Sequence, residues 1–203
     1  MYYRLQLLAE HVDGRRFEFS SDYAREANLR VGTHPDCDLV LTGREISSFH
    51  LSLSFDATSR YLSCVGEHEN VFIWDLKKKK QVRELKGHAQ GCFLNSVAFS
   101  PDGQQIASGG NRGEVLCHNV RGRDVACRLV RDVSDSTDSL VGQVRFSPLR
   151  PSVVGVAYGD GTLSIYDRAA GGTAEPSVDP ADSPILRIKP IVEWKLHSKP
   201  TDH

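Results

Sequence analysis

The sequence predicts an all-β fold, and three observations support this prediction. Three segments of similar length recur along the chain, each begins with an alternating apolar run that ends in Phe, and turn-forming residues separate the apolar runs. The phenylalanines are Phe55, Phe99 and Phe146, which lie 44 and 47 residues apart. Helical periodicity is confined to about one turn near residues 22–29. The pattern is therefore strand, turn, strand, turn, strand, repeated.

The end of each unit repeats with the same period. The units close on Asp75, Asn119 and Asp167, which lie 44 and 48 residues apart. Residues 100–103, Ser-Pro-Asp-Gly, favour a hairpin because Pro fixes φ and Gly tolerates a positive φ. Residues 160–161, Asp-Gly, do the same in the third unit. The Phe at the end of the first apolar run and the Asp or Asn at the end of the unit thus both recur about every 45 residues. This period is typical of a repeat architecture.

The composition is that of an ordinary globular domain. The chain has 203 residues, of which 39% are hydrophobic and 25% charged, and its formal net charge is -1. A near balance of charge disfavours nucleic-acid binding by the whole chain, so we expect no nucleic-acid partner. No apolar stretch approaches the length of a membrane span, and the first residues do not resemble a secretory signal. We therefore expect no membrane association and a cytoplasmic location.

The cysteines do not indicate a disulfide framework or a metal site. There are five, an odd number, and no two are closer than ten residues apart. We expect reduced thiols that behave mostly as small buried hydrophobic groups. They are Cys37, Cys64, Cys92, Cys117 and Cys127.

The central segment resembles a known family. The run Val-Phe-Ile-Trp-Asp-Leu at 71–76, the pair Gly87-His88 and the stretch from Ser96 to Gly110 are similar to the WD-repeat β-propeller family, in which each repeat forms a four-stranded blade. The resemblance implies that Trp74 and Asp75 end an inner strand, with Trp74 as a core anchor. It also implies that residues 81–85 form an outer strand and that Gly87-His88 opens the next blade.

The same resemblance implies a hydrogen-bonded set of four side chains in each blade. In the second unit His88 and Ser108 match the first two positions. The turn position, where the family has Asp, is nearest Arg112, and the Trp position holds His118. We therefore expect an incomplete set in this blade.

The third unit departs further from the family pattern. Asp160 and Tyr166 hold the turn and Trp positions, and Asp167 closes the unit, but no Gly-His pair precedes it. We expect these substitutions to lower stability without changing the fold.

The resemblance sets the expected domain organisation. Residues 1–46 are predicted to be a degenerate first blade or cap, and residues 47–168 are predicted to be WD-repeat blades. Residues 169–184, rich in Gly, Pro and Asp, are predicted to be a flexible linker, and residues 185–203 a terminal strand or tail. Three clear blades and at most a fourth make a partial propeller, whereas the family usually closes with seven. We expect self-association or further blades to complete it.

Four consecutive lysines, Lys77, Lys78, Lys79 and Lys80, follow the Trp-Asp pair. They occupy the predicted turn before the outer strand, where lysines face water and discourage edge-to-edge pairing. The alternative is a binding surface for an acidic partner, which would be weakened by salt. The sequence leaves both interpretations open.

A narrower resemblance concerns function. The basic turn after Trp-Asp-Leu, the ending Leu-Cys-His-Asn-Val at 116–120 and the missing Gly-His pair are similar to the WD-repeat family that targets γ-tubulin ring complexes to centrosomes and spindles. The resemblance implies a non-catalytic protein-interaction scaffold in microtubule organisation, with γ-tubulin complex components as partners and a cytoskeletal or centrosomal location.

The first fifty residues offer an alternative. Gly32, the strand in residues 35–41, Ser47 and His50 resemble the forkhead-associated domain, a β-sandwich that binds phosphothreonine, and Asn70 lies at a suitable distance. The family's phosphate-binding arginines are missing, because residues 33 and 48 are Thr and Ser. This alternative is a phosphopeptide-binding module at the N-terminus.

The sequence shows little sign of catalysis. Ser100, His88 and Asp102 are the residue types of a triad, but the Ser lies in a hairpin turn without a nucleophile-elbow sequence. The group His34, Asp36 and Asp38 is interpreted as turn residues because no further metal ligand lies nearby. We expect no enzymatic activity, no cofactor and no bound metal.

Overall fold

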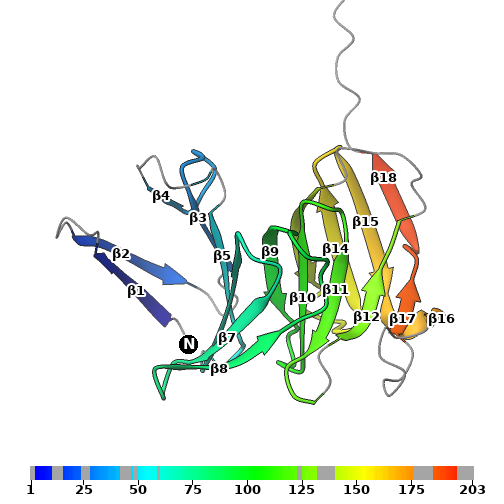
Figure 1. The fold of residues 1–203 in the computed structure, drawn as a ribbon, viewed down its shortest axis with the longest axis horizontal. Helices are drawn as coiled ribbons and strands as arrows, with labels where there is room; N and C mark the ends of the chain where they lie inside the picture. The colour runs from blue at the N-terminus through cyan, green and yellow to red at the C-terminus, as the bar shows by residue number, and fades with distance from the viewer. Residues whose placement is uncertain are drawn as a thin grey trace, which may run out of the picture.

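The computed structural model describes residues 3–10, 16–23, 28–41, 47, 50–58, 60–122, 125–131, 140–175 and 185–195. Strands account for nearly all regular structure in these ranges, and the one helical element among them is the short 3-10 turn η1, Arg168–Ala170. The predicted all-β class is therefore confirmed (Figure 1).

Three consecutive antiparallel sheets form the body of the chain, and we call them blades 1 to 3. Blade 1 contains β5 (Leu51–Phe55), β6 (Tyr61–Gly66), β7 (Val71–Asp75) and β8 (Lys80–Leu85). Blade 2 contains β9 (Leu94–Phe99), β10 (Gln105–Gly110), β11 (Val115–Asn119) and β12 (Val125–Leu129). Blade 3 contains β13 (Val141–Phe146), β14 (Val153–Tyr158), β15 (Thr162–Asp167) and β18 (Val192–Lys195). As predicted, residues 81–85 lie in the outer strand of blade 1.

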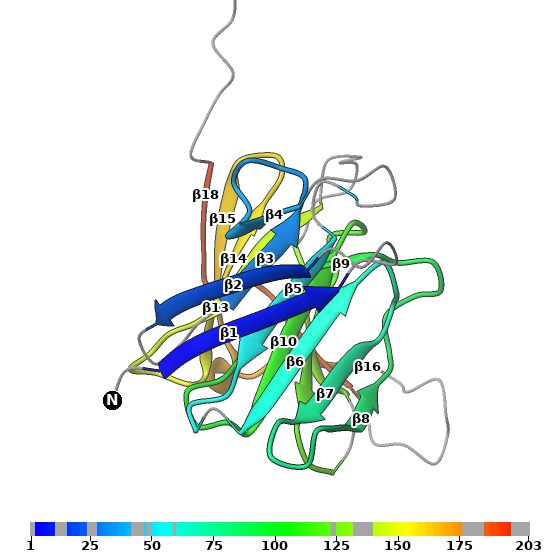
Figure 2. The same ribbon diagram turned by 90° about the vertical axis from the view of Figure 1, so that its left-hand side faces the viewer.

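The N-terminal strands enlarge blade 1 at its inner edge. β3 (Asn28–Gly32) pairs antiparallel with β5, and the short β4 (Leu39–Val40) pairs parallel with β3. The hairpin of β1 (Tyr3–Glu10) and β2 (Arg16–Tyr23) forms a separate two-stranded sheet. Figure 2 shows this hairpin crossing in front of blade 1. β3 and β4 thus extend the first blade, and the function of residues 1–46 as a cap stays a prediction.

The C-terminal strands follow the outer edges of two blades. β17 (Ile185–Ile188) pairs parallel with β12, and β16 (Thr173–Glu175) pairs antiparallel with β17, so both extend blade 2 outward. β18 then completes blade 3 by pairing with β15. One segment, residues 185–195, therefore lies along blades 2 and 3 in turn (Figure 1). Within the predicted flexible linker, residues 173–175 are instead the paired strand β16, because β17 supplies them with a partner, and residues 176–184 lie outside the described ranges.

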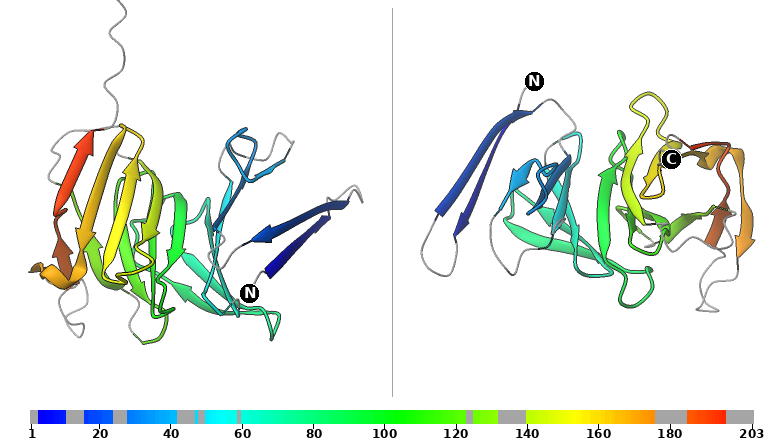
Figure 3. Two further views of the ribbon diagram at one scale, coloured as in Figure 1. Left: turned by 180° about the vertical axis from the view of Figure 1, so that it is seen from behind. Right: turned by 90° about the horizontal axis from the view of Figure 1, so that it is seen from above.

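The repeat predicted from the sequence is present in the sheet register. Each of the three phenylalanines is the last residue of the first strand of its blade, and each begins an equivalent row of side chains across the sheet. The rows are Phe55, Leu62, Trp74; then Phe99, Ile106, His118; then Phe146, Val154, Tyr166. The three units are therefore structural equivalents, and their sheets stack face to face without closing a ring (Figure 3).

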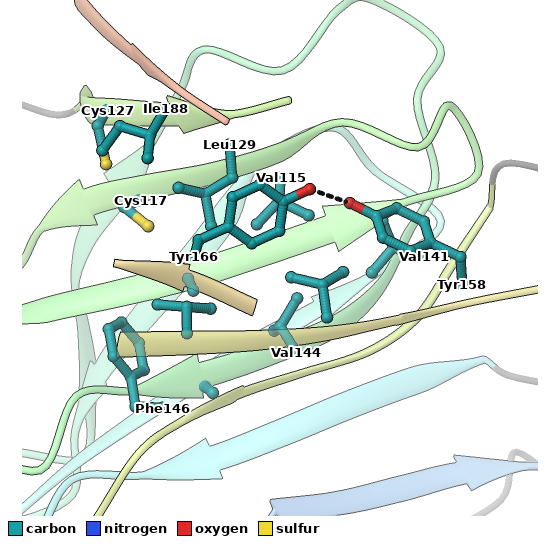
Figure 4. Packing of buried hydrophobic residues seen from close by; sticks show 14 residues of the cluster. Val115, Cys117, Cys127, Leu129, Val141, Val144, Phe146, Tyr158, Tyr166 and Ile188 are labelled. Atoms are coloured by element: carbon teal, nitrogen blue, oxygen red, sulfur yellow. Dashed lines mark hydrogen bonds between the residues drawn. The ribbon is translucent and has the colours of Figure 1, made fainter. Parts of the chain in front are cut away.

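Two apolar cores fill the space between the blades. Val65, Val71, Ile73 and Leu85 of blade 1 pack with Leu94, Val97, Phe99 and Ile106 of blade 2. Val115, Cys117 and Leu129 of blade 2 pack with Val141, Val144, Val154, Tyr158 and Tyr166 of blade 3 (Figure 4). Each large side chain buried in this way contributes about 1.5 to 3 kcal/mol. Packing between blades, rather than within one sheet, therefore holds the fold together.

Serine hydroxyls also join the blades at their inner strands. β9 and β13 form the inner edges of their sheets, so some of their N–H groups have no strand partner. Ser54 Oγ accepts a hydrogen bond from the Phe99 N–H at 3.1 Å, and Ser96 Oγ accepts one from the Val144 N–H at 3.0 Å. Both contacts are buried. Each hydroxyl thus satisfies an edge donor of the following blade.

We expect Ser96→Ala to lower the free energy of unfolding by about 1 to 3 kcal/mol, because it leaves the buried Val144 N–H without an acceptor. Urea denaturation measures this loss. Ser147→Ala is the matched control: its hydroxyl accepts the Arg150 N–H in an exposed turn, where water can replace it, so its effect is below about 0.5 kcal/mol. Equal effects for the two variants would contradict the assigned contact between blades.

Candidate functional site

The four lysines lie in a turn whose conformation is fixed by a buried carboxylate. Asp75 is only 1% exposed; its Oδ1 accepts the Lys78 N–H at 3.0 Å and its Oδ2 accepts from Arg60 Nη2 at 3.2 Å. These hydrogen bonds from Lys78 and Arg60 lower the pKa of Asp75. Lys79 adopts a positive φ of 52°, as tight turns require. The turn is therefore well defined, and all four lysine side chains are exposed.

Further cations lie at the same end of the sheets. In an antiparallel meander, the turn after the first strand and the turn after the third strand of each blade fall at one end. This end, at the bottom of Figure 1, is called the basic turn face. Its cations are Arg60, Lys77, Lys78, Lys79, Lys80, Arg121, Arg150 and Arg168. The opposite end of blade 1 carries Glu67 and Glu69, so the blade is electrostatically polarised.

At this opposite end, His88 forms the centre of a buried hydrogen-bonded set. Its Nε2 lies 2.8 Å from Ser108 Oγ, as the family resemblance implied. Its Nδ1 lies 3.2 Å from Glu114 Oε2, and Glu114 also pairs with Arg128 at 2.6 Å. Burial alone would raise the pKa of Glu114, but the His88 hydrogen bond and the Arg128 charge lower it.

The expectation that Arg112 leaves this set without a carboxylate is therefore corrected. Glu114, two residues later and beside β11, reaches His88 in place of a turn Asp. Gly87 is required before the histidine: its φ is 135°, and a Cβ there would lie 2.6 Å from the Val125 side chain. The Gly-His pair thus positions blade 2 as the resemblance implied.

The Trp position of blade 2 holds a fully buried histidine. His118 Nε2 lies 3.3 Å from the Lys86 carbonyl oxygen, and its Nδ1 has no hydrogen-bond partner within the described residues. Its ring centroid lies 5.9 Å from that of His88. Burial and the neighbouring His88 lower the pKa of His118 to about 3. His118 is therefore neutral at physiological pH.

In blade 3 an arginine takes the place of the missing Gly-His histidine. Arg131 follows β12 by two residues, much as His88 follows β8 by three. Its Nη2 donates to Asp160 Oδ2 and to Thr162 Oγ1, both at 3.1 Å, and its Nε donates to Glu193 Oε2 at 3.2 Å.

The arginine also packs against the aromatic core of this blade. Its guanidinium lies 4.3 Å from the centroid of the Tyr158 ring, and the Tyr158 and Tyr166 hydroxyls are 2.9 Å apart (Figure 4). The side chain of Arg131 is 8% exposed. Asp160 and Tyr166 therefore lie in one network, as the resemblance implied, and Glu193 ties β18 to it. Sequence reasoning missed Arg131 because the residue type differs from the expected histidine.

The prediction that Trp74 anchors the core is wrong. Trp74 is 39% exposed, whereas its neighbours Ile73 and Asp75 are 1% exposed. Side chains alternate between the faces of a strand, and the face of blade 1 that carries Ile73 packs on blade 2. Trp74 points to the other face, against which no further blade packs in the described part of the chain. Asp167, by contrast, matches Asp75 as a turn anchor: its Oδ1 accepts the Ala169 N–H at 3.0 Å.

The residues of the forkhead-associated alternative are partly brought together. Ser47 Oγ lies 3.4 Å from His50 Nδ1, near the end of β3 that carries Gly32. However, Glu67 Oε1 lies 3.5 Å from the same His50 nitrogen and would repel a phosphate. Asn70 Nδ2 instead donates to Glu84 Oε1 at 2.6 Å on β8. The geometry therefore disfavours a phosphate site, and Ser48 lies outside the described residues.

The structure does not bring together the residues of a catalytic triad or of a metal site. Ser100 Oγ donates to Asp102 Oδ1 at 2.6 Å in the turn between β9 and β10, whereas His88 lies at the opposite end of blade 2. Asp38 accepts the Arg30 N–H, and His34 lies 3.7 Å from Asp36. Among the described residues, no group of three or more His, Cys, Asp or Glu is arranged to hold a metal ion.

All five cysteines are free thiols, and four of them are buried, as predicted; Cys64 is half-buried. Burial raises the pKa of the Cys37, Cys64 and Cys92 thiols. Within the described ranges, no helix is long and apolar enough to span a bilayer.

Comparison with known proteins agrees with this architecture. Residues 79–119 match the family model of the WD domain, G-beta repeat. The match begins in the lysine turn and runs through β11, so it covers the junction of blades 1 and 2. The fold is therefore all-β with a WD repeat at residues 79–119, and the blades of the described residues do not close into a ring.

The chain is similar to human protein NEDD1, with 28% identity over 115 residues, which are 57% of this chain and 16% of that protein. It is 30% identical over 125 residues to the periodic tryptophan protein 2 homolog of Dictyostelium discoideum, covering 60% of this chain and 13% of that one. The β-propeller domain of Myceliophteria thermophila Cps50 (Swd1) has 16% identity and a TM-score of 0.49, covering 66% of this chain and 38% of that structure. The chain thus spans less than a fifth of the length of these two curated relatives.

Proposed function

We propose that this chain is a non-catalytic protein-interaction scaffold that serves microtubule organisation by recruiting γ-tubulin complexes. The observation that carries the proposal is the turn of Lys77–Lys80, which is exposed yet fixed by buried Asp75. A rigid cluster of cations favours encounter with an acidic protein surface, and little conformational entropy is lost on binding.

The WD repeat supports the scaffold part of the proposal, because proteins of this family act by binding other proteins. The microtubule part rests on the sequence resemblance to the family that targets γ-tubulin ring complexes. A location at centrosomes and spindles belongs to the same proposal.

Additional blades, or a second copy of the chain, are also proposed as partners. The outer faces of blades 1 and 3 carry exposed tryptophans, Trp74 at 39% and Trp194 at 49%. Exposed tryptophans support this proposal because Trp is enriched in protein–protein interfaces.

We expect purified γ-tubulin ring complex to bind the immobilised full chain at low salt and to bind about tenfold more weakly to the variant Lys77→Gln, Lys78→Gln, Lys80→Gln. Lys79 is left unchanged because of its positive φ. Raising the salt from about 50 to 300 mM weakens capture by the unaltered chain, because salt screens exposed charges. Surface plasmon resonance measures both effects.

The matched control is Lys86→Gln with Arg112→Gln, which removes one exposed cation from the opposite end of each of blades 1 and 2. It leaves capture unchanged. A phosphothreonine peptide library is screened in parallel, and selective phosphopeptide binding lost in His50→Ala would favour the forkhead-associated alternative. No capture by the unaltered chain would refute the γ-tubulin function.

A further inference from the structure

A small pocket of mixed polarity opens on the basic turn face, at the point where the inner strands of the three blades end. Its lining consists of three phenylalanines, three small apolar residues and four polar residues: Phe55, Phe99, Phe146, Ala57, Ala98, Pro101, Asn28, Ser54, Ser100 and Arg145. Its empty volume is about 380 Å³, open solvent at the mouth included. Because each phenylalanine is the last residue of its inner strand, the pocket is a direct product of the repeat.

The rim of the pocket is polar on one side. The Arg145 guanidinium extends from β13, and its Nη1 donates to the Val144 carbonyl at 2.9 Å. The Asn28 amide is satisfied when its nitrogen faces Ser54 Oγ at 2.6 Å and its oxygen faces Arg145 Nη1 at 3.1 Å. These contacts hold Arg145 at the mouth. The pocket therefore combines three phenylalanines and small neighbouring residues with a fixed cation, which suits a small aliphatic side chain in an acidic peptide.

The cations of blade 1 continue outward from this pocket. Arg60 lies in the turn between β5 and β6, and the lysines lie in the turn between β7 and β8. The carboxylates of the blade 1 turns are buried: Asp56 is 5% exposed and bonds within its own turn, and Asp75 is 1% exposed. Asp102, in the blade 2 turn beside the pocket, is exposed and accepts hydrogen bonds from Ser100 and the Gln104 N–H. The path from the pocket to the lysines thus presents positive charge to a ligand.

Strand spacing sets the length of this path. The inner strand β5 and the outer strand β8 are three strand intervals apart, or about 14 Å. An extended peptide covers about 3.3 Å per residue, so about four residues connect the pocket to the lysine turn.

From this geometry we infer that the basic turn face binds an extended acidic peptide, whose small aliphatic side chain enters the Phe55, Phe99, Phe146 pocket and whose carboxylates, about four residues away, contact Lys77–Lys80. The inference rests on the scaffold function proposed above and specifies the class of partner. Specificity comes from the pocket and from the spacing, while charge supplies the rate of encounter.

The test uses fluorescence anisotropy with the full chain and a labelled probe, Val-Ser-Gly-Ser-Glu-Glu-Glu. Three altered probes replace Val by Ser, replace the Glu residues by Gln, or delete the Ser-Gly-Ser spacer. We expect the original probe to bind about tenfold more tightly than each altered probe at about 50 mM salt.

Protein variants locate the two contacts. Ala57→Leu fills the pocket from an exposed turn, and it weakens the original probe to the level of the Ser probe. The triple lysine variant weakens the original probe to the level of the Gln probe. The control Lys86→Gln with Arg112→Gln leaves binding unchanged. Circular dichroism and a urea melt verify that each variant is folded.

Equal binding of all four probes would overturn the inference, as would loss of binding in the control variant. Displacement of the probe by a single-stranded oligonucleotide at equal concentration would also overturn it, because the face would then bind polyanions without using the pocket. Failure of the probe with intact capture of γ-tubulin ring complex would refute this inference alone. Failure of capture with intact probe binding would refute the proposed γ-tubulin function alone.

Discussion

Arg131→Met is expected to lower the free energy of unfolding by about 3 kcal/mol, because it removes one member of a largely buried ion network. Asp160 and Glu193 then lose their shared cation, and the Tyr158 ring loses the guanidinium that stacks on it. Hydrogen bonds to Arg131 and Thr162 outweigh burial and lower the pKa of Asp160. Urea denaturation at pH 7 measures the loss.

The variant Arg131→Lys distinguishes the contribution of the positive charge from that of the planar guanidinium shape. A lysine keeps the positive charge but has no planar guanidinium to bond Asp160 and Glu193 at once while stacking on Tyr158. We expect it to recover less than half of the loss. A decrease of under about 1 kcal/mol for Arg131→Met would show that the network is solvated and adds little to stability.

Acidification from pH 6.5 to 5 is expected to cost about 2 kcal/mol through His118 alone. The pKa of His118 is about 3 in the folded chain, and an unfolded histidine has a pKa of about 6.5. Between these values the unfolded state binds more protons, so stability rises with pH, by about 1.4 kcal/mol per unit. The stabilisation is complete above about pH 6.5 and is lost progressively below it.

His118→Gln isolates this contribution, because an amide can still donate to the Lys86 carbonyl but does not titrate. We expect the variant to show a much flatter dependence of stability between pH 6.5 and 5. The carboxylates with lowered pKa, such as Glu114 and Asp75, lose their contribution only below about pH 4 and are unaffected in this window. Identical pH profiles for both proteins would contradict the buried neutral histidine.

The sequence was sufficient to predict the repeat because its markers are local. A Phe at the end of an alternating run and an Asp or Asn at the end of the third strand recur with one period, and turn residues lie between them. Each marker depends on a few neighbouring residues. The pairing of His88 with Ser108 followed from the same pattern once the repeat was recognised.

Other features could not be predicted, because they depend on contacts between distant segments. Glu114 takes the place of the expected turn Asp at a shifted position, and Arg131 takes the place of the expected histidine. Only the hydrogen bonds of these side chains in the folded structure reveal the replacements. The parallel pairing of β17 with β12 joins segments separated by about 60 residues. A strand of four residues does not specify so distant a partner.

Trp74 illustrates a different limit. The Trp-Asp pattern predicts the strand correctly, and Asp75 is buried as a turn anchor. Whether Trp74 is buried, however, depends on what packs against the outer face of blade 1. The sequence of the strand that carries Trp74 does not specify this neighbour. The open pocket lined by Phe55, Phe99 and Phe146 likewise became visible only when the three blades were stacked.

The stacking of equivalent blades is the claim on which the pocket and the basic turn face depend. NMR on the full chain tests it through two nuclear Overhauser contacts, from the Phe99 amide to the Ser54 β-protons and from the Val144 amide to the Ser96 β-protons. These pairs lie 45 and 48 residues apart in sequence and meet only when successive blades pack face to face. We predict that both contacts are present. Their absence, with the contacts within each sheet intact, would show that the sheets form without stacking and would contradict the account.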